Sequence, residues 1–306
     1  MRVLVTGADG FLGRGLAARL ALAPLPIEKL VLTDRAFAEP ALAGVDQSAG
    51  DLSDPAFLET LLEPGFDLVF HLASVPGGLA EREQALGQKA NLLAPIALAT
   101  AVAERRPGAR FVFASSIGVY GTLGNDAVTI HTRTTPDLTY GAHKLMTEYL
   151  LSDMARRGVL SSISLRFPGI VARPQTESGH GSAFMSLLFH RIAAGEAYAC
   201  PVPASSVCWW VSRRAAVDLL LNAAQLEAGR VTLVQPPALV ATTGEVAVAV
   251  AHYIGRPANV TWGSDETLRQ LFGAMPPLDA SEALALGFKA DADLETLAKA
   301  ALSGEP

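Results

Sequence analysis

Tyr140 and Lys144 lie four positions apart in the sequence Y-G-A-H-K, and together they have the chemistry of a general base. On a helix this spacing puts both side chains on one face, which brings the lysine ammonium near the phenol. A nearby positive charge favours the phenolate and lowers a pKa that starts near ~10. A base with such a pKa can take the proton of an alcohol as hydride leaves the carbon. The pair is therefore a candidate general base, which alone does not identify a reaction.

A glycine-rich turn, T-G-A-D-G-F-L-G at residues 6–13, follows a short apolar run and opens a predicted helix over residues 11–21. Gly7, Gly10 and Gly13 let the backbone turn tightly and approach a pyrophosphate, while the helix N-terminus supplies unpaired N–H groups and a positive dipole end. Y-x-x-x-K recurs by chance in helices, and a glycine turn names no reaction. The two motifs together predict hydride transfer with a bound dinucleotide.

Asp34 closes a second predicted strand, residues 29–33, about twenty residues after the turn. A carboxylate at that place can accept hydrogen bonds from both hydroxyls of the adenosine ribose, and it would repel the 2′-phosphate of NADP. The neighbouring Arg35 could instead pair with that phosphate or stack on adenine. We expect NAD as the cofactor, with NADP as the alternative that Arg35 leaves open.

Other candidates stand at the ends of later strands. Asp51 follows a short third strand, and its carboxylate could face the adenine amino group. The sequence H-L-A-S at residues 71–74 ends the fourth strand and could line the phosphate and the nicotinamide ribose. Both could equally be ordinary strand ends. Ser116, at the end of the fifth strand, could hold the reacting oxygen by a hydrogen bond.

Strands that are apolar throughout alternate with helical segments over the first 170 residues, which predicts a parallel sheet covered on both faces. The expected fold class is a doubly wound α/β fold of the Rossmann type. After Pro168 the regularity weakens, so we expect a smaller, discontinuous substrate region. The expected domains are an NAD-binding domain of residues 1–170 with 207–232 and a substrate-binding region of 171–206 with 233–306. The predicted strands are 3–5, 29–33, 47–50, 67–71, 110–114 and 161–166, and the predicted helices are 11–21, 84–105, 140–157, 211–228, 243–253 and 294–302.

Composition narrows the classes of partner. The formal net charge is −6 and the chain has no run of Lys or Arg, so we expect neither a nucleic-acid nor an anionic-membrane partner. No stretch approaches the ~20 apolar residues of a membrane-spanning helix. The two cysteines, Cys200 and Cys208, lack a C-x-x-C spacing, which fits a reducing cytoplasm and predicts no metal site.

Several motifs resemble, in their order, those of the extended short-chain dehydrogenase/reductase family, in its nucleotide-sugar epimerase/dehydratase-like branch. They are T-G-A-D-G-F-L-G, the strand-end Asp34, H-L-A-S, Asn91, S-S-I-G-V-Y-G, Y-G-A-H-K and L-R-F-P-G-I, all within residues 1 to about 172. The resemblance implies Tyr140 as catalytic base, Lys144 as its partner and a ligand of the nicotinamide ribose, Ser116 in the serine role, and Asn91 as a structural residue. The cofactor-binding set is then Gly7, Asp9, Gly10, Phe11, Leu12, Gly13, Asp34, Arg35, Asp51, Leu52, Leu72, Ala73, Ser74, Asn91, Tyr140, Lys144 and Pro168.

The segments 178–189, 200–203 and 209–218 are similar to those of a branch of this family that oxidises the C2 hydroxyl of a four-carbon sugar acid to the 2-oxo acid with NAD. A free carboxylate asks for a cation or clustered donors near the nicotinamide. Each candidate has a plainer alternative, since Arg173 could bridge the domain junction, His180 could be a solvated loop residue, and Arg213 could cap a helix. The predicted substrate residues are Ser74, Ser116, Tyr140, Arg173, His180, Ser182 and Arg213.

Three other functions remain open. A nucleotide-sugar 4-epimerase would use the same Ser, Tyr and Lys, but the C-terminal region shows no basic cluster for a nucleoside diphosphate. A dehydratase resembles Thr-Asp-Glu where this chain has Ser116-Ile117-Gly118, so its proton donor would be missing. A non-catalytic NAD(P)-sensing protein of this type tends to lose the tyrosine or lysine. The helices near 84–105 and 140–157 carry apolar faces, and the resemblance implies a homodimer in which such helices pair across a two-fold axis. The same Ala-rich faces would also suit internal packing.

Overall fold

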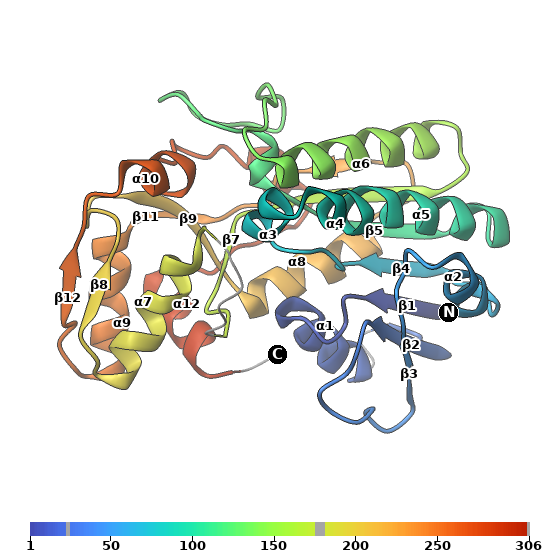
Figure 1. Cartoon of the computed structure of the whole chain (residues 1–306), viewed down its shortest axis with the longest axis horizontal. Helices are drawn as coiled ribbons and strands as arrows, with labels where there is room; N and C mark the ends of the chain where they lie inside the picture. Colours follow the sequence, from blue (N-terminus) through green and yellow to red (C-terminus); the bar gives the residue numbers. More distant parts are fainter. Residues whose placement is uncertain (23–24, 175–180, 305–306) are drawn as a thin grey trace.

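A seven-stranded parallel sheet forms the larger part of the computed structural model, which describes residues 1–22, 25–174 and 181–304. The strand order β10-β6-β5-β4-β1-β2-β3 reverses between β1 and β4, as in a doubly wound fold (Figure 1). The predicted fold class is confirmed. The strands are β1 (Arg2–Thr6), β2 (Lys29–Asp34), β3 (Val45–Ala49), β4 (Leu68–His71), β5 (Arg110–Ser116), β6 (Ser161–Phe167) and β10 (Leu233–Val234).

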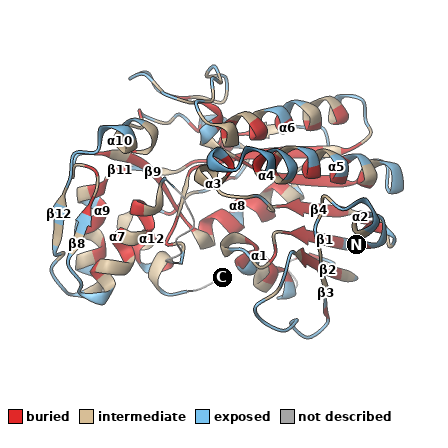
Figure 2. Ribbon diagram, viewed as in Figure 1, coloured by how far each residue is buried: buried red, intermediate tan, exposed pale blue. Residues whose placement is uncertain are grey.

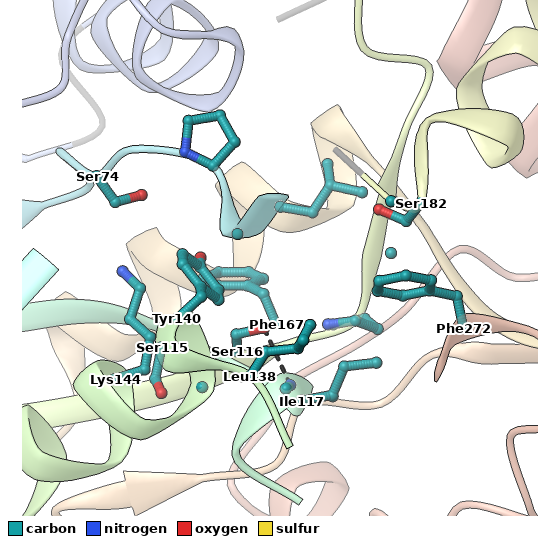
Figure 3. Close-up of a pocket in the computed structure, with 18 of the residues that line it drawn as sticks. Ser74, Ser115, Ser116, Ile117, Leu138, Tyr140, Lys144, Phe167, Ser182 and Phe272 are labelled. Atoms are coloured by element: carbon teal, nitrogen blue, oxygen red, sulfur yellow. Dashed lines mark hydrogen bonds between the residues drawn. The ribbon is translucent and has the colours of Figure 1, made fainter. Parts of the chain in front are cut away.

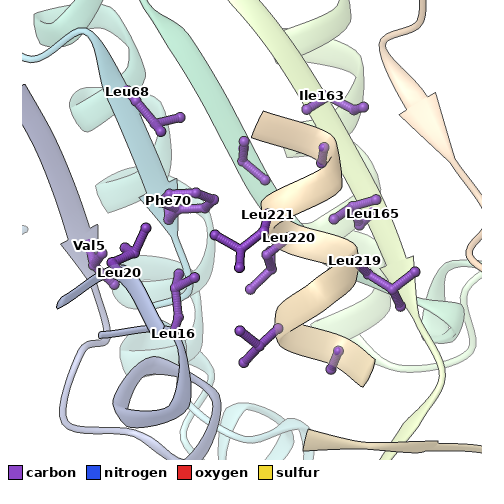
Figure 4. Close-up of a cluster of buried hydrophobic side chains, with 14 of the residues drawn as sticks. Val5, Leu16, Leu20, Leu68, Phe70, Ile163, Leu165, Leu219, Leu220 and Leu221 are labelled. Carbon is purple, nitrogen blue, oxygen red and sulfur yellow. The ribbon is translucent and has the colours of Figure 1, made fainter. Parts of the chain in front are cut away.

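Helices cover both faces of this sheet because its strands are buried on both sides (Figure 2). On one face α1 (Phe11–Ala21) and α8 (Arg213–Gln225) pack their leucines against alternate residues of the central strands (Figure 4). On the other face lie α2 (Pro55–Leu62), α5 (Ala94–Arg105) and α6 (Thr139–Arg156). The two apolar layers fix the sheet, and the carboxyl ends of its strands form one edge.

The predicted helix over residues 84–105 is interrupted in the structure. It consists of α4 (Gln84–Gln88), a π-helical turn η1 (Lys89–Leu93) and α5, and the short α3 (Gly77–Arg82) precedes it. Pro95 has no N–H to donate to the carbonyl of Asn91 four residues earlier, which disfavours a regular α-helical turn there. The wide turn carries Asn91, whose side chain is buried and reaches the loop after β4.

The remaining segments build a smaller region with its own apolar core, on the side of α7 and α9 in Figure 1. β9 joins this region's sheet, in the order β11-β9-β7, while α8 directly after it packs on the large sheet. The domain boundaries predicted from the sequence therefore remain a prediction, because one continuous segment contributes to both regions. The elements are β7 (Gly169–Val171), α7 (Ala183–Ala194), β8 (Tyr198–Cys200), β9 (Val207–Ser212), β11 (Leu239–Thr242), α9 (Thr243–Ile254), β12 (Val260–Trp262), α10 (Glu266–Phe272), α11 (Ser281–Ala285) and α12 (Leu294–Leu302).

Within the described ranges, no helix is both long and apolar enough to cross a membrane. Cys200 and Cys208 are buried free thiols.

Candidate active site

A cavity of about 590 Å³ lies where the carboxyl ends of β1, β4, β5 and β6 meet the smaller region (Figure 3). This is where open parallel sheets bind ligands, because the loops leaving the strands diverge at the point of reversal. Most of the predicted site residues line it. They are Gly7, Gly10, Phe11, Leu12, Gly13, Leu72, Ser74, Ser116, Tyr140, Lys144, Pro168, Arg173 and Ser182.

The glycine turn at one end of the cavity has no room for side chains. Gly7 has a φ of 68°, and a Cβ there would lie 2.6 Å from the backbone nitrogen of Ala73. A Cβ on Gly13 would lie 2.1 Å from the carbonyl oxygen of Gly7. Gly10 is the N-cap of α1 and offers no capping side chain, so the first N–H groups of the helix remain open to an anion. These features fit the pyrophosphate of a dinucleotide.

Asp34, at the end of β2, is fixed by backbone donors. Its Oδ2 accepts a 2.9 Å hydrogen bond from the N–H of Asp9, and its Oδ1 accepts one of 2.7 Å from the N–H of Arg35. Asp9 in turn pairs with Arg14 at 3.1 Å and accepts from the N–H of Ala38 at 3.3 Å. Two carboxylates thus lie side by side at the end of β2, and the predicted contact of Asp34 with a ribose stays a prediction. Asp34, Asp9 and Arg35 flank the cavity without lining it.

Asp51 is engaged within the protein. One carboxylate oxygen accepts hydrogen bonds from the N–H and hydroxyl of Ser53, and the other pairs with Lys89 at 3.1 Å. Mainly because of the bonds from Ser53, the pKa of Asp51 falls to about 2. Its side chain therefore has a structural role, and the adenine contact stays a prediction. Leu52 is partly buried and packs against the core that α2 and α5 share.

Asn91 clamps the loop that follows β4. Its Oδ1 accepts from the N–H of Val75 at 2.8 Å, and its Nδ2 donates to the carbonyl of Val75 at 3.0 Å. This holds the neighbouring Ser74 at the cavity and agrees with the structural role predicted for Asn91. His71, at the end of β4, is buried against Thr6, and burial lowers the pKa of its imidazole to about 3, so it is neutral.

Tyr140 and Lys144 occupy the first two turns of α6, facing the cavity (Figure 3). Lys144 Nζ lies 5.4 Å from the ring centroid of Tyr140 and donates a 2.8 Å hydrogen bond to the carbonyl of Ala114 in β5. Glu81 of α3 accepts a bond of 2.9 Å from the N–H of Thr139, which satisfies one free donor at the start of α6. The predicted pair is therefore brought together.

The electrostatics of this pair differ from the sequence expectation. Burial raises the pKa of Tyr140 above its ordinary value, and this outweighs the lowering effects of a hydrogen bond with Ser74 and of the charge of Arg173. Burial also lowers the pKa of Lys144 to about 7, although Glu148 opposes the change. The predicted lowering of the Tyr140 pKa is wrong for this arrangement, because desolvation acts more strongly than the hydrogen bond with Ser74 and the charge of Arg173.

Ser116 ends β5 opposite the start of α6. Its Oγ accepts a hydrogen bond of 3.1 Å from the N–H of Gly118. A Cβ on Gly141 would lie 2.2 Å from the carbonyl oxygen of Gly118, so only glycine lets α6 approach the turn after β5 this closely. The close packing brings Ser116 and Tyr140 to one wall of the cavity (Figure 3).

Arg173 supplies a cation on the opposite side, in the segment after β7. It is partly buried, its Nη2 donates to Ser182 Oγ at 2.9 Å, and its backbone N–H donates to Ser186 Oγ at 3.0 Å. Its positive charge acts on Tyr140. The apolar side chains that line the cavity include Ile117, Leu138, Met185, Leu271, Phe272 and Met275.

One predicted substrate residue that the structure describes does not line the cavity. Arg213, at the start of α8, lies 5.1 Å from the ring of Phe11 and donates to the carbonyl of Gly304, and it is not among the residues that line the cavity. Its position in a motif could not show that α8 directs it toward α1. His180 lies outside the described residues.

A buried polar cluster behind Lys144 was missed from the sequence. Glu148 accepts hydrogen bonds from Arg166 of β6 and Ser115 of β5. The i,i+4 spacing of Lys144 and Glu148 was a visible signal. Ser115 of β5 and Arg166 of β6 meet Glu148 only because of the strand order, which the local sequence does not show.

The strand order, the glycine turn and the Tyr140–Lys144 pair together define a dinucleotide-binding site for hydride transfer on a Rossmann-type fold. The NAD dependent epimerase/dehydratase family matches residues 3–207, which is more than half of the chain, and the chain belongs to this family.

Two curated relatives are named D-erythronate dehydrogenase. The one from Cupriavidus necator is 35% identical and covers 98% of this chain and 97% of its own length. The one from Haemophilus influenzae is 29% identical, with 97% of each chain covered. A crystal structure described as the nucleoside-diphosphate-sugar epimerase from Agrobacterium tumefaciens superimposes with a TM-score of 0.89, at 32% identity, over 98% of this chain and 92% of that one. These likenesses confirm the predicted family, NAD as cofactor and an NAD-dependent dehydrogenase.

Proposed function

We propose that this enzyme oxidises the C2 hydroxyl of a four-carbon sugar acid, D-erythronate, to the 2-oxo acid. The observation that carries the proposal is a partly buried guanidinium, that of Arg173, in the same cavity as Tyr140, Lys144 and Ser116. A small hydroxy acid has a carboxylate that can pair with the guanidinium, and a hydroxyl on which Tyr140, Lys144 and Ser116 can act. The names of the two curated relatives support this choice.

The site residues divide the work as follows. Arg173 pairs with the substrate carboxylate, with Ser182 orienting its guanidinium. Ser116 and Ser74 hold the substrate hydroxyl beside Tyr140, which takes the hydroxyl proton as the C2 hydrogen leaves with its electron pair. Lys144 provides the charge that favours the phenolate. Bound NAD supplies the hydride acceptor, with Asp34 at its ribose and the glycine turn at its pyrophosphate.

The apolar wall that faces the catalytic residues has two consequences. It excludes water from the place where charge develops, and it leaves few polar groups for a large substrate. Among the described residues lining the cavity, the cations are Lys144 and Arg173. A nucleoside diphosphate would need further cations, so the acid is favoured over the nucleotide-sugar 4-epimerase alternative.

The test is NADH formation with NAD and D-erythronate, beside L-threonate, other short sugar acids and a UDP-sugar in a coupled epimerase assay. Turnover of D-erythronate with release of a 2-oxo acid supports the proposal. No reaction with any acid, together with epimerisation of the UDP-sugar, refutes it and establishes the alternative. NAD binding without any turnover would identify a sensing protein.

We also propose a homodimer. Leu93, Met146 and Tyr149 are exposed large apolar residues on η1 and α6, two elements that pack side by side (Figure 1). Pairing of these helices across a two-fold axis would bury them. A monomeric mass by light scattering would refute this, and Tyr149→Glu should dissociate the dimer.

We propose the cytoplasm as the location. The two cysteines are buried and unpaired, and burial raises the pKa of both thiols, which suits a reducing compartment. Fractionation of the native host would test this.

A further inference from the structure

Glu148 lies one helical turn after Lys144 on α6 and is held from two strands. Its carboxylate accepts hydrogen bonds from Arg166 Nη2 at 2.8 Å and Nε at 3.1 and 3.2 Å, and from Ser115 Oγ at 2.5 Å. Both side chains of the Glu148–Arg166 pair are 5% exposed, and every other ion pair of the described residues has side chains at least 21% exposed. Burying two charges carries a large desolvation penalty, so a purely structural contact would be made at lower cost in free energy by apolar side chains.

The pair is connected to the catalytic wall through consecutive residues of β5. Ala114 accepts the hydrogen bond from Lys144, Ser115 donates to Glu148, and Ser116 lines the cavity. Two hydrogen bonds, one residue apart, therefore join α6 to the same strand end. Any shift of Glu148 would move the carbonyl that directs Lys144 and the backbone that carries Ser116.

The charge of Glu148 also acts on Lys144. The titratable groups facing Lys144 are Tyr140 and Glu148 from its own helix and His71 from β4. His71 is neutral because burial lowers its pKa to about 3. Glu148 is thus the negative charge that opposes the effect of burial on the ammonium.

Arg166 is the charged partner of Glu148 in a buried place. Besides its bonds to Glu148, its guanidinium lies 4.9 Å from the ring centroid of Tyr120, and Glu148 raises the pKa of Arg166 above its ordinary value against the effect of burial. The chain of charges therefore runs from Arg166 through Glu148 to Lys144.

We propose that Glu148, held by Arg166 and Ser115, is a positioning residue for hydride transfer, which keeps Lys144 charged and directed at β5 and so sets the pH range in which Tyr140 acts. Loss of this negative charge lowers the pKa of Lys144 below about 7. A neutral Lys144 no longer favours the Tyr140 phenolate, so the acid limb of the kcat/KM profile moves to higher pH.

The test uses Glu148→Gln, which keeps the shape of the side chain and removes its charge. We expect the acid limb to move up by about one pH unit, with kcat/KM at neutral pH falling roughly tenfold. Because this variant leaves Arg166 buried and unpaired, the double variant Glu148→Gln/Arg166→Gln provides a second measurement with the pair replaced as a whole. The acid limb of the double variant should move to higher pH by the same amount. Glu148→Asp keeps the charge, so the acid limb of its kcat/KM profile should lie at the wild-type pH.

A control distinguishes this role from simple stabilisation. Glu59→Gln removes an exposed partner of Arg105 at 3.3 Å and should leave the profile unchanged. Ser115→Ala keeps the charge of Glu148, so it should lower kcat without moving the limb. If both variants that lack the Glu148 charge lose rate equally at every pH, the residue is structural and the proposal is overturned.

A substrate-free readout separates this proposal from the proposed function on which the kinetic assay rests. The chain has five lysines, so 13C NMR of lysine labelled at Cε can follow Lys144, assigned through Lys144→Met. The titration midpoint of Lys144 should fall by about one unit in both Glu148→Gln variants. An unchanged midpoint overturns the proposal whichever substrate the enzyme uses.

Discussion

Lys144 donates its hydrogen bond to the backbone of Ala114, two residues before Ser116. Lys144 is therefore anchored to the strand that ends in Ser116. This contact crosses from α6 to β5 inside the apolar core, so the relative positions of Ser116, Tyr140 and Lys144 are fixed by packing of secondary-structure elements rather than by loops.

Tyr140→Phe removes the hydroxyl that takes the substrate proton and leaves the ring in place. We expect kcat to fall by roughly 10²- to 10⁴-fold, which is the usual contribution of a general base. The affinity for NAD should stay within about twofold, because the glycine turn and Asp34 do not contact this oxygen. Initial rates and calorimetric titration with NAD measure the two effects. Tyr253→Phe, on the exposed face of α9, is the matched control. Rates near wild type would refute the assignment of the base.

Arg173→Gln tests the carboxylate site. A hydrogen-bonded charge contributes about 2–3 kcal/mol, so we expect KM for the sugar acid to rise roughly 30- to 150-fold. The loss should appear in KM more than in kcat, because the carboxylate does not change charge during the reaction. Steady-state kinetics measure it, with Arg191→Gln, which breaks an exposed pair with Glu196, as control. An unchanged KM would place the carboxylate elsewhere.

Local patterns indicated the turn and the strand end that the structure brings together. The turn at residues 6–13 and the strand-end Asp34 are read from neighbours in sequence; the glycines of the turn line the cavity, and Asp34 lies beside the turn, bonded to the N–H of Asp9. Their contacts with the cofactor stay a prediction. The wide turn at Asn91 was not predicted, since helical periodicity does not reveal where Pro95 interrupts the hydrogen-bond ladder.

Tertiary effects were not visible in the sequence. The pKa of Tyr140 rises because of burial, which the spacing to Lys144 cannot show. Arg213 packs on Phe11 because α8 lies against α1, and motif order does not give that direction. Glu148 and Arg166 meet only because β6 lies next to β5 under α6.

Asp34→Asn tests cofactor preference. The change removes the charge that would repel a 2′-phosphate and keeps a side chain of the same shape. We expect NAD to bind roughly tenfold more weakly and NADP to bind more tightly, so that the preference narrows by about 10²-fold. Asp9 should still repel the 2′-phosphate in part. Its carboxylate is held near Asp34 by a 3.3 Å hydrogen bond from the N–H of Ala38. Dissociation constants for NADH and NADPH by fluorescence measure the ratio, with Asp218→Asn, from an exposed pair, as control. An unchanged ratio would move discrimination to another residue.

Lys144→Met should stabilise the fold while abolishing turnover. Burial lowers the pKa of Lys144 from 10.5 to about 7 in the folded chain, so the folded state disfavours the ammonium. Between about pH 7 and 10.5 the unfolded chain binds more protons, and this group makes stability rise with pH; below about pH 7 its full penalty applies.

The variant removes that penalty, on the order of 2–5 kcal/mol. We therefore expect a higher Tm than wild type at pH 6 and a difference that shrinks as the pH approaches 10. Thermal unfolding across this range measures it, and Lys299→Met on the exposed face of α12 should show no such trend. A pH-independent difference, or a wild type that is the more stable at pH 6, would mean that the Ala114 hydrogen bond and Glu148 fully compensate the buried charge. In that case Lys144 would be held as an ammonium at no cost to the fold.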